Sequence, residues 1–189
     1  QKPARMVWQG DNDKFYVIRQ SRDIKRADLC VVDVATATAK DVIEEKMNTS
    51  IEWQMPTLIS GDREVIQWSE RTGWAHLYRY TAEGELVNQI TKGEWHVSNV
   101  LGVDDAKRVI YFTATGYNKD ENPYYLHLFR VNYDGSGLKQ LDPKDFNGEF
   151  PLSDDRRYFV TTYSRADAAP VSELYTVEGK KVMTLAEVD

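Results

Sequence analysis

The stretch "SERTGWAHLYRYTAEGEL" (residues 69–86) predicts a β-hairpin followed by a second turn. An apolar run ends in Ser-Glu-Arg, a Gly-Trp pair marks a tight connection, and "HLYRY" leads into the next turn. Alternation of apolar and polar residues with a period of two is typical of a half-buried strand. Gly84 can supply the positive φ that a tight hairpin requires. The stretch therefore predicts two antiparallel strands and the turn into a third.

The same pattern occurs four times along the chain. The first strand of each hairpin lies in "FYVIRQSRD", "EVIQWSER", "VIYFTATG" and "YFVTTYSR", which begin at residues 15, 64, 109 and 158. Equivalent positions in these runs are 49, 45 and 49 residues apart: Val17, Ile66, Tyr111 and Val160. The second strands begin at residues that are 48, 51 and 46 apart: Leu29, Leu77, Leu128 and Leu174. Two independent positions thus give one period of about 40–50 residues, which is the signature of a propeller blade.

The rest of each repeat agrees with a four-stranded blade. A short apolar strand precedes an acidic turn, as "RMVW", "PTLIS", "SNVLGV" and "EFPLS", and a Gly turn precedes the last strand in three repeats. We therefore expect an all-β fold, a β-propeller of about four four-stranded antiparallel blades at residues 4–48, 53–92, 95–142 and 149–187. Residues 1–189 would form a single partial domain, an arc of a larger propeller. A β-sandwich with coincidental spacing is the alternative.

Composition excludes several classes of function. The net charge is −6 and the basic residues are scattered, which argues against a nucleic-acid partner. Cys30 is the single cysteine, so an intrachain disulfide framework or a cysteine-based metal site is excluded, and its apolar surroundings predict a buried, inert thiol. No stretch approaches the roughly 18 apolar residues of a membrane span, and no targeting segment is visible in the first residues.

Three longer segments are similar to a known family. These are "WSERTGWAHLYRY", "ITKGEWHV" and "YFTATGYNKDENPYYLHLFRVNYDG". In this order, the Gly-aromatic-x-His hairpin, the Thr-x-Gly-x-Trp strand start and the Leu-aromatic-Arg-Val strand resemble the N-terminal propeller of dipeptidyl peptidase IV-like enzymes. These enzymes are serine exopeptidases of the prolyl oligopeptidase family. The resemblance runs from about residue 69 to 141 and extends more weakly over nearly the whole chain.

The resemblance implies a fold, partners and a location. It implies an eight-bladed propeller of which this chain is the C-terminal half, and an α/β-hydrolase domain of the same parent chain that carries the catalytic serine, aspartate and histidine. It also implies a peptide substrate, a periplasmic or extracellular location, and allows a homodimer. The chain itself would be a non-catalytic gate and scaffold of a serine-type dipeptidyl peptidase. A stand-alone propeller-like module that binds a protein or another ligand is the alternative, and a carbohydrate-binding β-protein is a third class.

The motifs that could carry chemistry are better explained by structure, so we expect no catalytic residue, metal or cofactor in this chain. Glu44 and Glu45 resemble a substrate-binding acidic pair, but adjacent strand residues point to opposite faces, and a solvated strand edge fits better. Ser136 lies in "DGSG", a repeat turn rather than a Gly-x-Ser-x-Gly elbow. The histidines fall on or beside different strands, two of them at repeat-equivalent positions: His76, His96 and His127. The Asp11-Asn12-Asp13 segment predicts a turn, since it lacks the Gly and Glu of a calcium loop.

Five residues remain as candidates for substrate or partner contact. Glu70, Arg71 and Trp74 lie in the opening hairpin and have no strict counterparts in the other repeats. Tyr117 and Tyr124 lie in the polar loop of residues 116–125, which is longer than its counterparts. Packing between blades, or an ordinary ordered loop, is the alternative for each. The family's further substrate-lining aromatic would fall near residues 53–55, where the local motif does not match, so Trp53 is not assigned that role.

Overall fold

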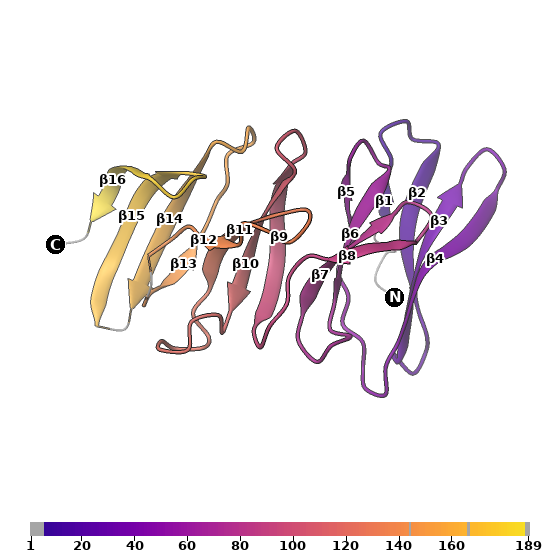
Figure 1. Cartoon of the computed structure of the whole chain (residues 1–189), viewed down its shortest axis with the longest axis horizontal. Helices are drawn as coiled ribbons and strands as arrows, with labels where there is room; N and C mark the ends of the chain where they lie inside the picture. Colours follow the sequence, from indigo (N-terminus) through magenta and orange to yellow (C-terminus); the bar gives the residue numbers. More distant parts are fainter. Residues whose placement is uncertain (1–5, 144, 166, 188–189) are drawn as a thin grey trace. The chain divides into compact units, whose positions relative to one another are not determined.

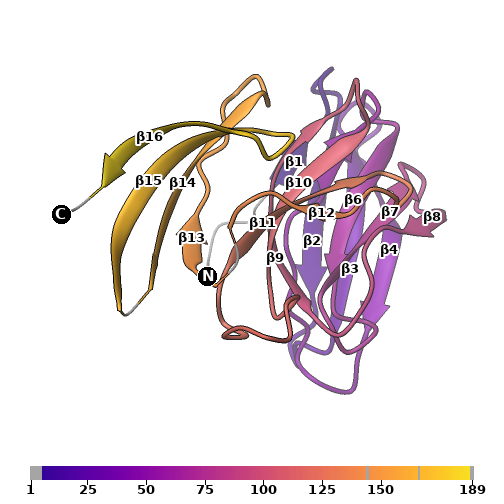
Figure 2. The same cartoon turned by 60° about the vertical axis from the view of Figure 1, so that its left-hand side comes forward.

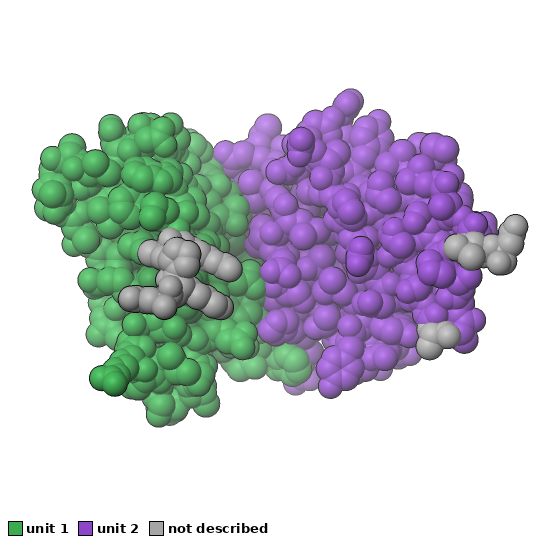
Figure 3. Space-filling model, turned by 180° about the vertical axis from the view of Figure 1, so that it is seen from behind, with its two compact units in different colours: residues 1–91 green, residues 92–189 purple. Residues whose placement is uncertain are grey.

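The described part of the chain contains only β-strands. The computed structural model describes residues 6–143, 145–165 and 167–187 (Figure 1). These residues form sixteen strands and no helix. The chain divides into two compact units, Gln1–Thr91 and Lys92–Asp189, which Figure 3 shows in different colours. Each unit is described by itself below.

Unit 1 contains two four-stranded antiparallel sheets. The strands of the first sheet, in spatial order, are β1 (Met6–Trp8), β2 (Lys14–Gln20), β3 (Arg26–Asp33) and β4 (Thr38–Lys46). Those of the second sheet are β5 (Thr57–Ile59), β6 (Glu64–Ser69), β7 (His76–Thr81) and β8 (Leu86–Gln89). Every strand pairs with its neighbours in sequence, so each sheet is a simple meander.

Unit 2 contains two further sheets of the same kind (Figure 2). The strands of the third sheet are β9 (His96–Asp104), β10 (Val109–Thr115), β11 (His127–Asn132) and β12 (Lys139–Gln140). Those of the fourth are β13 (Asn147–Glu149), β14 (Tyr158–Arg165), β15 (Ala168–Thr176) and β16 (Lys181–Glu187). Four sheets of four antiparallel strands are the expected blade architecture, so the predicted fold class is confirmed.

One of the short first strands lies at a different place from the prediction, and another is described only in part. In the fourth sheet the first strand is Asn147–Glu149 rather than "EFPLS". Pro151 has no N–H to donate to a ladder, and Leu152 retains only an isolated bridge to Phe159. In the first sheet, Met6–Trp8 forms the predicted strand, while Arg5 of "RMVW" and residue 4, the predicted start of the first blade, lie outside the described residues.

The glycine turns before the last strands have one geometry in three sheets. The three amides donate to the carbonyl three residues earlier at 2.9–3.0 Å, and the φ angles are 96°, 88° and 87°: Gly84, Gly135 and Gly179. A side chain is strained in this region, and glycine is not. The predicted turns are therefore confirmed. The Gly84 turn also lies directly against β4, because a Cβ built on Gly84 would be 1.8 Å from the carbonyl oxygen of Val42.

Each unit has an apolar core between its two sheets. In unit 1 the buried members are Tyr16, Leu29, Ile43, Val65, Tyr78 and Tyr80. In unit 2 they are Val109, Tyr111, Leu128, Leu141, Phe150, Phe159, Tyr175 and Val177. Six of the seven residues of β10 are buried, so this strand is covered on both faces. A strand covered on both faces has a continuous apolar run, and "VIYFTAT" has that pattern.

Candidate functional site

The hairpin between β6 and β7 holds Arg71 in a cluster of polar and aromatic groups. The guanidinium donates to the hydroxyl of Tyr80 and to the carboxylate of Glu45 on β4. It lies over the ring of Tyr78, with Cζ 4.3 Å from the ring centroid. Its Nε and its backbone N–H donate to Oγ of Ser69 at 3.1 and 3.2 Å. Arg71 therefore links the hairpin of the second sheet to the last strand of the first sheet.

The charge of Arg71 is stabilised by this environment. Burial alone would lower the pKa of the guanidinium, but the nearby Glu45 carboxylate and Tyr80 hydroxyl outweigh burial and raise it. Burial raises the pKa of the Tyr80 hydroxyl, against the opposing effect of Arg71. All five N–H groups of an arginine side chain are donors and none is an acceptor. Two of the three guanidinium nitrogens have an oxygen partner on another strand or sheet, so Arg71 acts first as a structural link.

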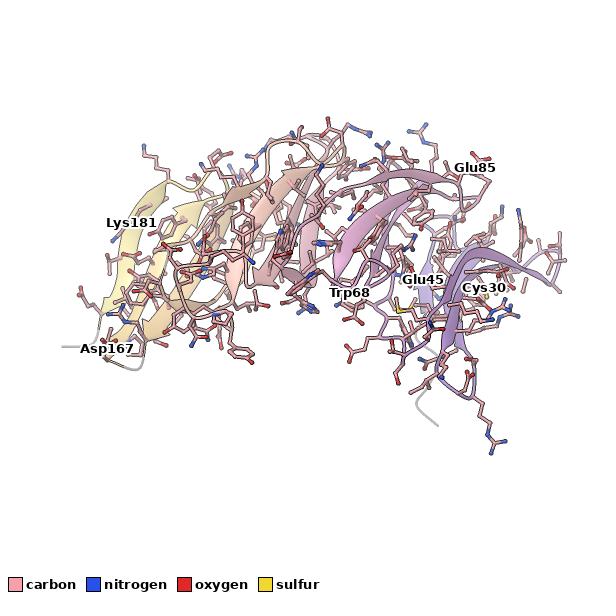
Figure 4. The ribbon with its side chains drawn as sticks, turned by 60° about the horizontal axis from the view of Figure 1, so that its bottom comes forward. Cys30, Glu45, Trp68, Glu85, Asp167 and Lys181 are labelled. Atoms are coloured by element: carbon pink, nitrogen blue, oxygen red, sulfur yellow. The ribbon has the colours of Figure 1, made fainter. Side chains whose placement is uncertain are left out.

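Glu45 corrects one expectation for the acidic pair on β4. Glu44 is solvated as expected, with a side chain that is 64% exposed. The side chain of Glu45 is only 9% exposed and pairs with Arg71, so it is not part of a solvated strand edge. Figure 4 labels Glu45 on this strand. The two side chains point to opposite faces, and only one face meets the neighbouring sheet.

Replacing Glu45 by glutamine is expected to lower the free energy of unfolding by about 1–2 kcal/mol, because Arg71 would lose its charged partner in a partly buried place. Urea unfolding followed by circular dichroism measures the change. Glu44→Gln, on the same strand but exposed, is the matched control and should change stability by less than about 0.5 kcal/mol. Equal effects of the two substitutions would contradict the role of the Glu45–Arg71 pair.

Trp74 is exposed without the polar contacts that hold Arg71, whereas Glu70 is partly buried. The side chain of Trp74 is at the hairpin surface, with 43% of the residue exposed. Glu70 is partly buried, and its carbonyl accepts the amide hydrogen bond of Gly73 at 2.8 Å. A hollow of about 10 Å³ lies between the sheets of unit 1, lined by Glu45, Trp53 and Gln67 among others. Such a volume holds about one water molecule and no peptide side chain.

The loop between β10 and β11, residues 116–126, contains the two candidate tyrosines in different settings. Tyr124 is 85% exposed. Tyr117 is 38% exposed and packs edge-on against Phe129, with ring centroids 4.9 Å apart, and against Trp95 at 5.4 Å. Tyr124 is thus available to a partner, whereas Tyr117 partly closes an aromatic cluster.

A buried polar network contacts this loop on its inner side. This network was not predicted from the sequence. His127 begins β11, and its Nδ1 lies 2.7 Å from Oδ2 of Asp142. Its Nε2 lies 2.8 Å from Oε1 of Glu121, a loop residue. The three side chains are 1%, 3% and 5% exposed. Gln140 contacts both His127 and Asn118, at 3.1 and 2.9 Å.

In the second sheet, the residue that corresponds to Asp142 is an uncharged threonine, Thr91. His76 begins β7, and its Nδ1 lies 3.1 Å from Oγ1 of Thr91. Thr91 also accepts from the amide of Leu77 at 3.0 Å, and Asp142 accepts from the amide of Leu128 at 2.8 Å. The predicted repeat equivalence of the two histidines is therefore confirmed. Alignment of the repeats would have identified Thr91 and Asp142, since each follows its histidine by 15 residues.

The other motifs form turns or buried structure. Ser136 donates to Oδ1 of Asp134 at 2.7 Å within a hairpin turn. Asp11 accepts from the amide of Asp13 at 3.1 Å, in a turn as predicted. Cys30 is a buried free thiol, and burial raises its pKa to about 12. Within the described ranges, no group of three or more His, Cys, Asp or Glu side chains is arranged to hold a metal ion. The same part of the chain has no helix long and apolar enough to cross a membrane.

Comparison with known proteins gives a consistent result. The family described as "Dipeptidyl peptidase IV (DPP IV) N-terminal region" matches residues 4–170. Dipeptidyl peptidase 4 of Arthroderma otae is 32% identical over 125 residues, which are 65% of this chain and 16% of that protein. Dipeptidyl peptidase 4 of Trichophyton rubrum is 31% identical over the same length, with the same shares.

Two solved structures have the same fold. The crystal structure of Porphyromonas gingivalis dipeptidyl peptidase 4 matches with a TM-score of 0.84 and 21% identity, over 96% of this chain and 26% of that chain. A putative dipeptidyl aminopeptidase IV from Bacteroides ovatus matches with a TM-score of 0.82 and 23% identity, over 96% of this chain and 28% of that chain. The chain thus spans about a sixth of the curated relatives named above and about a quarter of the solved chains.

Proposed function

The chain belongs to the dipeptidyl peptidase IV N-terminal region family, and from this membership we propose that it is a non-catalytic propeller segment of a serine-type dipeptidyl peptidase. In this role it contributes blades to an eight-bladed propeller, supports an α/β-hydrolase domain of the same parent chain and limits access of peptides to it. The parent enzyme acts outside the cytoplasm, in the periplasm or the extracellular space. Nothing in the segment supplies the reaction chemistry.

One observation carries this proposal. The family match extends over residues 4–170, across both units, and all four sheets have the blade topology. A segment made only of such blades offers a rigid scaffold with exposed connections, and binding surfaces are commonly built on such connections. The buried polar clusters at Arg71 and His127 act on neighbouring protein groups rather than on an open site. Scaffolding and gating therefore fit the chain better than catalysis.

Contact with the substrate or with the hydrolase domain is assigned to the exposed aromatic residues. Trp74 and Tyr124 are 43% and 85% exposed and can give a peptide or a partner domain apolar contact area. Tyr117 and Glu70 are secondary contacts, and Arg71 positions the hairpin that carries Trp74. The surfaces around Trp74 and Tyr124 could also bind a second copy of the chain.

The test compares the isolated chain with the full-length protein that contains it. The 189-residue chain should release no dipeptide from a chromogenic Xaa-Pro substrate. In the full-length enzyme, Trp74→Ala should lower kcat/KM for long peptides about 3–10-fold, the effect of losing about 1 kcal/mol of contact. It should leave kcat/KM for the small chromogenic substrate unchanged, because that substrate does not reach the propeller surface.

Val87→Ala is the matched control for Trp74, since Val87 is 44% exposed but lies on the outer strand β8. It should alter neither rate constant. Hydrolysis by the isolated chain, blocked by a serine-directed inhibitor, would overturn the assignment of a non-catalytic segment. Equal loss of both activities in Trp74→Ala would overturn gating while leaving the scaffold role in place.

A further inference from the structure

The carboxylate of Glu121 is one of the groups that hold the loop of residues 116–126 inward. Oε1 of Glu121 lies 2.8 Å from Nε2 of His127 and accepts from the side-chain amide of Asn118. Oε2 accepts from the backbone N–H of Asp145 at 2.7 Å. The Glu121 side chain is 5% exposed although the loop around it is polar and partly solvated. The contacts of Glu121 therefore add to the Asn118–Gln140 hydrogen bond and the packing of Tyr117 in holding the loop.

His127 meets a carboxylate at each ring nitrogen. Asp142 lies 2.7 Å from Nδ1, opposite Glu121 at Nε2. The two nitrogens point to opposite sides of the ring, so the three residues cannot chelate one metal ion. A neutral imidazole carries one N–H and can donate to one partner only, whereas the imidazolium carries two. Both contacts can therefore be favourable together only when the ring is charged or a carboxyl group is protonated.

The contact with Glu121 depends on charge more than on hydrogen-bond alignment. Nε2 is buried, and no acceptor among the described residues is aligned with it. Asp142 and Gln140 lie beside Nδ1, at 2.7 and 3.1 Å, and Asp142 accepts a hydrogen bond from Nδ1 whenever that nitrogen carries a proton. When the ring is neutral with its proton on Nδ1, a lone pair on Nε2 faces the carboxylate of Glu121. That arrangement is repulsive and leaves a buried charge without its counter-ion.

We propose that His127, Glu121 and Asp142 form a protonation-dependent latch, in which the imidazolium holds the 116–126 loop against β11 and the neutral imidazole releases Glu121. The loop carries Tyr124, the most exposed of the large apolar residues. The latch therefore controls how rigidly a tyrosine surface is presented to a partner. The inference stands on the geometry of the cluster and is independent of the function proposed above.

The ionisable groups around the cluster set the direction of the switch. Burial would lower the pKa of His127, but Asp142 and Glu121 outweigh it, so the pKa lies above its ordinary value. Burial raises the pKa of Asp142, although His127 opposes this. Tyr175 of β15 acts on the cluster through Asp142. Two other charged side chains, one in this loop and one beside the backbone N–H that Glu121 accepts from, are paired elsewhere: Lys119 with Glu94 and Asp145 with Arg165.

The sign of the effect follows from the raised pKa of His127. A group whose pKa is higher in the latched state stabilises that state fully below its unlatched pKa, and this contribution is lost as the pH rises through the latched pKa. The latch is therefore closed at pH values below the pKa of His127 in the latched state, and it opens as the pH rises through that pKa. The ratio of closed to open loop changes tenfold for each pKa unit by which latching raises the pKa of His127.

The test follows the loop and the histidine in the same samples of the full chain. A histidine-selective NMR titration gives the pKa of each imidazole. Hydrogen exchange with mass spectrometry gives protection factors for the loop, each calculated against an unstructured peptide at the same pH. We expect loop protection to fall about tenfold or more, with a midpoint at the pKa of His127. Protection of β11 should stay constant over this range, which shows that the sheet remains folded.

Glu121→Gln keeps the size of the side chain and removes its charge. In this variant, loop protection at pH values below the original pKa of His127 should be lower and nearly independent of pH, and the pKa of His127 should fall. Glu94→Gln is the matched control, because Glu94 lies 3.9 Å from Lys119 of the same loop but is 80% exposed. It should keep the normal pH profile. The proposal is wrong if His127 titrates without a change in loop protection, or if Glu121→Gln keeps the normal pH profile.

Discussion

Replacing Phe129 by alanine is expected to lower the free energy of unfolding by about 3–5 kcal/mol, the usual cost of removing a buried phenylalanine. Phe129 lies on β11 and has no exposed surface. Its ring stacks with Phe112 at 5.6 Å and with Trp95 at 6.2 Å, and it contacts Tyr117 edge-on at 4.9 Å. The alanine would leave a cavity that three rigid rings cannot close. Stability of a domain is only about 5–15 kcal/mol, so the loss is a large part of the total.

Urea unfolding and thermal unfolding, both followed by circular dichroism, measure this loss, and we expect Tm to fall by about 10 °C. Tyr124→Ala removes an aromatic ring of similar size that is 85% exposed, and is the matched control. It should change stability by less than about 0.5 kcal/mol. A cost below about 1 kcal/mol for Phe129→Ala would show that the aromatic cluster does not hold the third sheet together.

Replacing Gly84 by alanine is expected to destabilise unit 1 by about 3 kcal/mol or more. Gly84 has a φ of 96°, and its Cβ would lie 1.8 Å from the carbonyl oxygen of Val42. The new methyl group must therefore displace either the turn between β7 and β8 or the strand β4. Overpacking of this kind costs about 1–3 kcal/mol, and an unfavourable φ adds about 1–3 kcal/mol.

Gly73→Ala separates these two costs. Gly73 has a similar φ of 88°, but nothing lies within 4 Å of its Cβ position. It should lose only the backbone contribution, about 1–2 kcal/mol. The difference between the two variants in urea unfolding therefore measures how closely the turn of the second sheet approaches the first. Equal losses would mean that the turn can move away from Val42 at no cost.

The repeated parts of the fold were predictable from sequence, because they depend on local chemistry. The turns at Gly84, Gly135 and Gly179 need a positive φ, and the central strands need continuous apolar runs such as "VIYFTAT". Pro151 explains the one strand that was misplaced. The sequence showed that a short strand precedes β14, but the missing N–H of the proline moves the pairing to Asn147–Glu149.

The candidate site was less predictable, because it depends on contacts between distant residues. Glu45 and Arg71 are 26 residues apart and belong to different sheets. Adjacent glutamates on a strand look alike in sequence, and only the packing of the sheets distinguishes Glu44 from Glu45. Glu121 is similar, since it lies in a polar loop whose composition predicts solvent exposure. Of this cluster, only the 15-residue spacing between His127 and Asp142 could be found by aligning the repeats in the sequence.

Pairing of each strand only with its sequence neighbours has a consequence for how the chain folds. Among the described residues, ladder partners are at most 23 residues apart, as Val109 and Asn132 are, so no sheet needs a distant part of the chain to form. The first sheet is complete in sequence at Lys46, so its strands can pair during synthesis, before the second sheet has left the ribosome. A single repeat cannot bury its apolar face alone, so the free energy of unfolding should increase with each following sheet, as in other repeat proteins. Duplication or loss of one whole sheet would leave every other strand pairing intact, and chains of this kind can change length by whole blades.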